Sequence, residues 1–144
     1  MTDNNPFHES KYQLPKGSTR SCPLVEVKIG ASKNPITALT DTGCSVGLAI
    51  MNSQISGLDL GEKISDDPYE IAVADGHKIE ADIYKADICL NGVKNTATIF
   101  VLNPDSFTDD TTDNQLIAYL GRDFLDNFDV LFKGKEQKVA FYNP

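Results

Sequence analysis

The chain has 144 residues, of which 40% are hydrophobic and 24% are charged, so it fits one globular domain with a modest core. Its formal net charge of −8 argues against a nucleic-acid partner and against binding to an anionic membrane surface, because both require a basic face. No apolar run approaches the roughly 20 residues of a membrane-spanning helix. Three widely spaced cysteines and two histidines predict neither a disulfide framework nor a zinc site.

The first 20 residues are polar and show no period of 2 or 3.6. We therefore expect residues 1–20 to be a flexible N-terminal arm, either loose or ordered only against another surface. This start lacks the apolar centre of a signal peptide, and together with the unpaired cysteines it favours a reducing cytoplasm. Residues 21–144 are expected to form the single folded domain, without a metal or other cofactor.

The folded region begins with an alternating segment in which Val25, Val27 and Ile29 face one way, as in a half-buried strand. After a turn at 31–34, residues 35–40 return as a second strand that ends at Asp41. A further apolar run follows at 46–51, and residues 52–60 are expected to be irregular or helical. The order strand, turn, strand, turn, strand already indicates a β-rich fold.

Two hairpins are predicted in the middle of the chain. The first spans 70–81 and has Asp75-Gly76 at its tip, a dipeptide typical of tight primed turns. The second runs from 85 to 102 around Asn91-Gly92. Residues 103–115 form a polar, acidic insertion that we expect to be a solvated loop. A calcium loop is rejected there, because Asn114 and Leu120 stand where such a loop requires Gly and Glu.

The C-terminal part is predicted from three short patterns. The continuous apolar run 116–120 is typical of a strand buried on both faces. Residues 123–128 predict one or two helical turns, with Phe124, Leu125 and Phe128 on one face. Segments 129–132 and 137–142 predict a last hairpin. The fold class that follows is all-β, with one short helix near the C-terminus.

The chemistry-bearing stretch is Asp41-Thr42-Gly43, a turn between two apolar strands. A carboxylate at the end of a buried strand is costly unless it has partners or keeps a proton. The alternative is an Asx-type turn, in which Asp41 only accepts backbone hydrogen bonds. Cys44 lies beside this turn, but no histidine is near it in sequence to act as its base, so a cysteine nucleophile is not favoured. The sequence contexts of phosphoryl-transfer aspartates are absent.

Two motifs in this order resemble the retropepsin-like aspartic proteases, the single-domain, homodimeric relatives of pepsin. The segment 23–30 before Asp41-Thr42-Gly43 resembles the approach to their catalytic turn, and 119–125 resembles their apolar-Gly-Arg-Asn/Asp-apolar-Leu signature. The resemblance covers roughly residues 23–142. It implies a small closed-barrel-like acid protease fold and an aspartic endopeptidase without a cofactor. The partners it implies are a second copy of the chain and an extended peptide or protein substrate.

The resemblance also assigns roles. Asp41 is the catalytic acid, Thr42 braces the two active-site loops across the dimer, and Gly43 lies close to the substrate strand. Leu120 and Gly121 pack behind the loop. Residues expected to contact the substrate lie beside the turn and at the tip of a closing flap: Cys44, Ser45, Ala74, Asp75 and Gly76.

Two departures from the retroviral pattern bear on function. Ser45 stands where many retroviral members have an acidic residue that pairs with the late arginine, here Arg122. Thr40 stands where the family usually carries an apolar side chain. They favour bacterial, archaeal or retroelement relatives over the retroviral enzymes. They also support the alternative function, a catalytically weak domain that binds peptides or mediates dimerisation, because fold does not guarantee activity.

Overall fold

The computed structural model describes residues 5–15, 17–72, 76, 78–103 and 118–144. Six strands close into a barrel in the order β2-β3-β9-β4-β8-β7, with β7 returning to β2 through the pairs Lys28↔Cys89 and Ile29↔Ile88. The barrel strands are β2 (Leu24–Ile29), β3 (Ile36–Thr40), β9 (Ala118–Leu120), β4 (Leu48–Met51), β8 (Val93–Leu102) and β7 (Lys78–Leu90). The predicted all-β fold class and closed barrel are confirmed.

Two parallel pairings are central to the barrel, because they bring distant parts of the chain together. β3 pairs parallel with β9, and β4 pairs parallel with β8, while β4 and β9 are antiparallel. The chain therefore passes from β3 through the Asp41 turn into β4, and β9 lies between these two strands. This arrangement places residues around 120 directly beside the turn.

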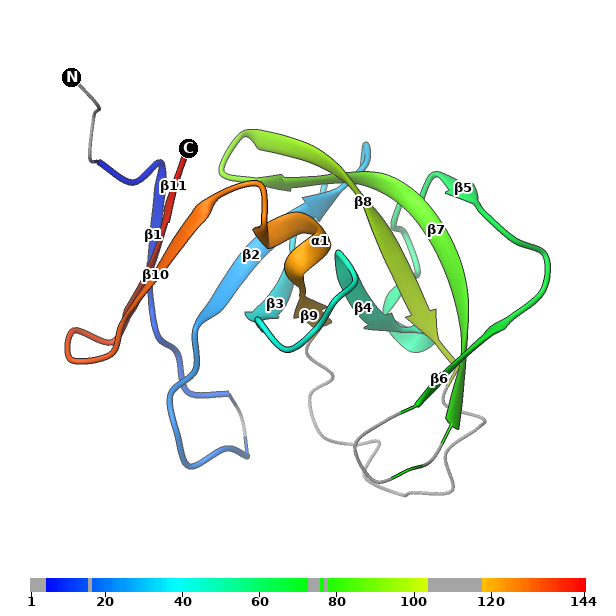
Figure 1. The fold of residues 1–144 in the computed structure, drawn as a ribbon, viewed down its shortest axis with the longest axis horizontal. Coiled ribbons are helices and arrows are strands. Elements are labelled where there is room, and N and C mark those ends of the chain that lie inside the picture. Colours follow the sequence, from blue (N-terminus) through cyan, green and yellow to red (C-terminus); the bar gives the residue numbers. More distant parts are fainter. Residues whose placement is uncertain (1–4, 16, 73–75, 77, 104–117) are drawn as a thin grey trace.

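A second sheet lies beside the barrel and has the order β1-β11-β10. Its strands are β1 (His8–Lys11), β11 (Lys138–Tyr142) and β10 (Asp129–Lys133). In Figure 1 this sheet stands at the left of the barrel, whereas β5 (Glu62–Lys63) and β6 (Tyr69–Ala72) lie at the right, along β7. β10 and β11 pair antiparallel, which confirms the last hairpin predicted from segments 129–132 and 137–142.

One short α-helix, α1 (Arg122–Leu125), follows β9, close to the predicted helical turns at 123–128. Phe124, Leu125 and Phe128 are buried, as their spacing predicted. They join the hydrophobic core of the barrel together with Val139 and Phe141 of β11. The helix and the second sheet are thus held to the barrel by one continuous core. A 3-10 turn, η1 (Asn52–Gln54), matches the expected irregular or helical piece.

Residues 8–11 lie within the segment that the sequence predicts to be an N-terminal arm. These residues form β1, which pairs antiparallel with β11 and so orders against another surface of the chain. Side chains of β1 alternate between half-buried and exposed, because one face of the strand packs on the molecule. The proposed boundary between an arm at 1–20 and a domain at 21–144 stays a prediction.

Two local expectations need correction. The two central hairpins share one continuous 13-residue strand, β7, in place of separate strands. The predicted burial of the 116–120 run on both faces is wrong at Tyr119, which is 43% exposed because alternate residues of a barrel strand point outward.

The hairpin around Asn91-Gly92 is confirmed, and both residues have positive φ as a type I′ turn requires. The acidic insertion after Asn103 lies outside the described residues.

Among the described residues, no helix is long and apolar enough to cross a membrane.

Candidate active site

The Asp41 turn is stabilised by the carboxylate itself. The Gly43 backbone N–H donates to Asp41 Oδ1 at 2.9 Å, and the Cys44 N–H donates to the Asp41 carbonyl at 3.2 Å. This is the hydrogen bonding of an Asx-type turn, which the sequence allowed. A Cβ at position 43 would lie 3.2 Å from Asp41 Oδ1, so a side chain there would crowd the carboxylate. Glycine keeps the acid accessible.

The loop after Asp41 is fixed from behind by the end of β9. The Asp41 N–H donates to the Leu120 carbonyl at 2.9 Å, and the Gly121 N–H donates to the Gly47 carbonyl at 3.0 Å. The Arg122 N–H donates to the Cys44 carbonyl at 2.8 Å. Leu120 and Gly121 therefore lie behind the loop, where the family resemblance expected them. These bonds hold the turn in one conformation.

Gly121 is required by this packing. A Cβ there would overlap the carbonyl oxygen of Val46 and would lie 2.6 Å from the carbonyl oxygen of Cys44. Both atoms belong to the backbone of the Asp41 loop. Moving them apart would break the hydrogen bonds of that loop. The glycine of the late motif is thus explained by a close approach between two chain segments.

Asp41 is half-buried, whereas Thr42 and Gly43 are exposed. Within the described residues, the only hydrogen bond of the Asp41 carboxylate is the one from Gly43, and no second acid contacts it. The acid thus sits at the surface, at the end of a buried strand, with one oxygen free to meet another group.

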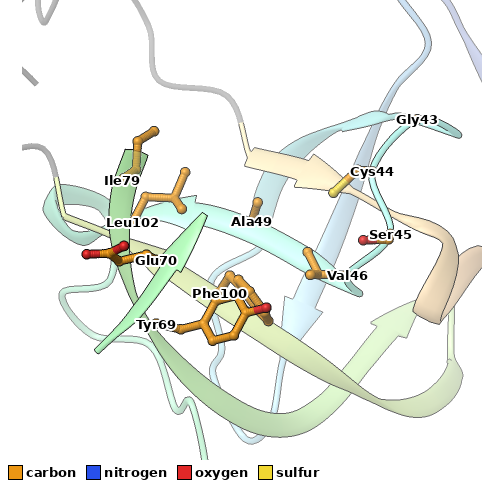
Figure 2. Close-up of a pocket in the computed structure, with 10 residues that line it drawn as sticks. All are labelled: Gly43, Cys44, Ser45, Val46, Ala49, Tyr69, Glu70, Ile79, Phe100 and Leu102. Carbon is orange, nitrogen blue, oxygen red and sulfur yellow. The ribbon is translucent and has the colours of Figure 1, made fainter. Parts of the chain in front are cut away.

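A pocket of about 440 Å³ opens beside the turn. Figure 2 shows Gly43, Cys44 and Ser45 at one end and Glu70, Ile79 and Leu102 at the other. Between them lie Val46, Ala49, Tyr69 and Phe100. The Tyr69 and Phe100 rings pack edge to face, with centroids 5.8 Å apart. The pocket is mostly apolar and runs from the Asp41 loop to β6, the first strand of the predicted flap.

The Cys44 thiol lies at the pocket, and its surroundings disfavour the thiolate form. Partial burial raises the pKa of Cys44, and the nearby charge of Asp41 raises it further. A backbone hydrogen bond at Val46 and the charge of Arg122 lower this pKa, but the net shift is upward. A thiol with a raised pKa forms little of the thiolate that a cysteine nucleophile requires. Asp41 is therefore the better candidate for chemistry at this turn.

The predicted contact residues are placed in part. Cys44 and Ser45 line the pocket. Ala74 and Asp75 lie outside the described residues, and Gly76 is exposed with φ +90°, a left-handed conformation that suits glycine in a tight turn.

Sequence reasoning missed most of the pocket wall. The missed residues are Val46, Ala49, Tyr69, Glu70, Ile79, Phe100 and Leu102. The hairpin pattern could have indicated three of them, because Tyr69, Glu70 and Ile79 belong to the paired strands β6 and β7. No local pattern indicates that Phe100 meets Tyr69.

The two departures from the retroviral pattern have structural counterparts. Thr40 is buried, and its hydroxyl has no hydrogen-bond partner among the described residues. The Arg122 side chain is exposed, and the described part of the chain gives its guanidinium no hydrogen bond or ion pair.

Among the described residues, no three His, Cys, Asp or Glu side chains lie close enough together to form a candidate metal site.

The fold is similar to that of a solved retroviral protease. It aligns with the EIAV protease in complex with the inhibitor HBY-793 at a TM-score of 0.54 and 21% sequence identity, over 75% of this chain and 88% of that one. It also aligns with the retroviral protease-like domain of Ddi1 from Leishmania major at a TM-score of 0.49 and 15% identity, over 83% of this chain and 93% of that one. No protein-family profile and no curated protein matches the sequence. The likeness to the EIAV protease shows that the chain has the retropepsin-like fold.

Proposed function

We propose that the chain is an aspartic endopeptidase whose active site is complete only in a homodimer. The observation that carries the proposal is the accessible carboxylate of Asp41, held by the Gly43 N–H at 2.9 Å beside an apolar pocket in a retropepsin-like fold. One chain offers this acid without an acidic neighbour among its described residues. A second copy, related by a two-fold axis, supplies the missing carboxylate.

The chemistry follows from two carboxylates that share a site. Like charges about 3 Å apart cannot both ionise, so one Asp41 keeps its proton while the other is ionised. The ionised carboxylate accepts a proton from a water molecule, which attacks the carbonyl carbon of the scissile peptide bond. The protonated carboxylate donates a hydrogen bond to the carbonyl oxygen, where negative charge develops.

The substrate proposed for this site is an extended segment of a peptide or protein. Gly43 allows the backbone of the substrate to approach, and Thr42 braces the paired loops. Cys44 and Ser45 contact the side chains of the substrate. The hairpin tip at Ala74, Asp75 and Gly76 closes over it as a flap. The pocket between β4, β6 and β8 accepts one apolar side chain of such a segment. We place the protein in the cytoplasm, among bacterial, archaeal or retroelement relatives of the retroviral enzymes.

A second candidate function is a peptide-binding or dimerisation domain with little turnover. The buried, unpartnered Thr40 hydroxyl favours it, since it lies directly before Asp41 at the base of the turn. An unsatisfied polar group in that place destabilises the strand end that holds the acid.

Incubation with a random peptide library separates the two candidates. The endopeptidase cleaves internal peptide bonds and shows a preference for apolar residues next to the cut, which mass spectrometry of the products reads directly. A domain that only binds enriches some peptides but leaves all of them intact. The second result would reject the enzymatic proposal.

A further inference from the structure

Arg122 is the first residue of helix α1 and lies directly beside the Asp41 loop. Its backbone N–H donates to the Cys44 carbonyl at 2.8 Å, and Figure 1 shows α1 next to the loop that leads from β3 to β4. The charge of Arg122 lowers the pKa of the Cys44 thiol, whereas the charge of Asp41 raises it. The guanidinium group therefore lies within Coulombic range of a side chain that lines the pocket.

The charge of Arg122 is not compensated within the described residues. Its side chain is exposed and has no hydrogen bond or ion pair there. Asp123 directs its carboxylate to β8, where it accepts hydrogen bonds of 2.9 Å from both the N–H and the hydroxyl of Thr98. Asp126, one helical turn further on, forms no ion pair with any described residue. In this part of the chain, the fold leaves the five N–H donors of the guanidinium available to another molecule.

Ser45 adds a second available donor at the same end of the pocket. It lines the pocket beside Cys44 and is exposed, and its hydroxyl has no hydrogen bond among the described residues. Serine is neutral, unlike the acidic residue that many retroviral members have at this position. It therefore leaves the positive charge of Arg122 in place.

The charges around the pocket indicate where an acidic group of a substrate would lie. Among the described residues of the pocket wall, Glu70 alone is charged, and it lies at the end opposite Ser45, 3.8 Å from the ammonium group of Lys78. An acidic side chain is repelled by Glu70 and attracted by Arg122. The apolar wall between the two ends takes an apolar side chain. A peptide that suits the whole site carries an apolar residue and, a few positions away, an Asp or a Glu.

We propose that Arg122 is a specificity-determining residue, which binds the carboxylate of an Asp or Glu side chain of the substrate, with the Ser45 hydroxyl as a second donor. The planar guanidinium can bind both oxygens of one carboxylate at once. The net charge of −8 disfavours a polyanion, so the ligand is a single carboxylate in an otherwise apolar or neutral segment. The inference rests on the proposed function, because it requires an extended peptide along the Asp41 loop.

Two peptides that differ in one residue test the role of Arg122. The random library first gives the position, relative to the cut, at which the wild type selects Asp or Glu. Two peptides are then made with Glu or Gln at that position. The wild type is expected to favour the Glu peptide roughly tenfold in kcat/KM, since hydrogen bonds between charged groups are stronger than neutral ones. Arg122→Gln should lower this ratio to about one.

Charge reversal and a conservative change make the test specific. Arg122→Glu should select Lys or Arg at the position where the wild type selects an acid. Arg122→Lys should keep the preference for Glu in weaker form, because an ammonium group cannot form the two parallel hydrogen bonds. Arg20→Gln is the matched control, since Arg20 is the other arginine of the sequence and is exposed before β2. The control should keep the wild-type ratio.

The inference is overturned when the wild type selects no acidic residue, or when Arg122→Gln keeps the wild-type ratio of Glu to Gln. It is overturned equally when Arg122→Gln slows both peptides alike, or when it separates dimers in sedimentation. Either result would assign the guanidinium to the fold or to a second copy and not to the substrate.

Peptide binding separates this inference from the proposed function. Acidic peptides that the wild type enriches but does not cleave, and that Arg122→Gln no longer enriches, would reject the enzyme and leave the carboxylate site standing. Cleavage without a preference for Asp or Glu would reject the carboxylate site and leave the enzyme standing. Neither binding nor cleavage of any peptide would reject both.

Discussion

Replacing Asp41 by asparagine is expected to abolish peptide cleavage while the protein still folds and dimerises. Asparagine has nearly the same shape, and its amide oxygen can accept the hydrogen bond from the Gly43 N–H that Asp41 Oδ1 accepts at 2.9 Å. The amide can neither take a proton from water nor share one with a second acid. Because general acid–base catalysis contributes up to about 10⁴-fold, we expect kcat/KM to fall roughly 1,000-fold or more.

The measurement is the rate of cleavage of a peptide selected from the library, with sedimentation run in parallel. Asp66→Asn is the matched control, since Asp66 is exposed and lies outside the Asp41 loop and the pocket. The control should cleave at the wild-type rate. Cleavage by Asp41→Asn at that same rate would remove Asp41 from the mechanism.

The second large effect is expected at Gly121. In Gly121→Ala the new methyl group overlaps the Val46 carbonyl oxygen and lies 2.6 Å from the Cys44 carbonyl oxygen and 2.9 Å from the Cys44 sulfur. The loop or the end of β9 must therefore move, which breaks the hydrogen bonds that fix the Asp41 turn. Forced overpacking of this kind costs about 3 kcal/mol of unfolding free energy. Denaturant unfolding measures the loss, and cleavage activity should fall with it.

Gly134→Ala is the control for this substitution. Gly134 lies in the β10–β11 turn, and a Cβ there has no other heavy atom within 4 Å. The control should change the unfolding free energy by less than about 0.5 kcal/mol, as is usual for surface positions. Equal stability of Gly121→Ala and the wild type would contradict the tight contact between the late glycine and the Asp41 loop.

The local patterns of the sequence predict a large part of this fold. Alternation in 24–29 predicts β2, Asn91-Gly92 predicts the turn between β7 and β8, and the spacing of Phe124 and Phe128 predicts the buried face at α1. Each of these features is decided within a few residues. The position of Asp41 between two strands belongs to the same class, because apolar runs flank it on both sides.

The continuous strand β7 shows why other features escaped prediction. Its buried residues lie at odd positions in its first half, Ile79 and Ala81, and at even positions in its second half, from Ala86 to Leu90. The alternation changes phase where the strand passes from β6 and β5 to β2, so the sequence looks like two strands. Tertiary pairing sets this phase, and no local pattern encodes it.

Part of the candidate site can likewise be predicted from the sequence, and part of it cannot. The acid, its glycine and the late glycine motif follow from sequence order together with the family resemblance. The pocket wall does not, because Tyr69 and Phe100 come from strands that meet only through β7. The position of Arg122 beside Cys44 depends likewise on β9, which pairs with both β3 and β4. Long-range strand order, which residue patterns do not specify, decides which surfaces remain available for a substrate or a second copy.

The central claim is that two copies of Asp41 form one site, and the stoichiometry of a transition-state mimic tests it most directly. A statine-type peptide carries a hydroxyl group that imitates the tetrahedral intermediate, so it should bind between the two carboxylates. Calorimetric titration of the wild type is predicted to give one inhibitor for every two chains, and Asp41→Asn is predicted to bind far more weakly. One inhibitor per chain, or equal binding by wild type and Asp41→Asn, would contradict a shared pair of Asp41 carboxylates.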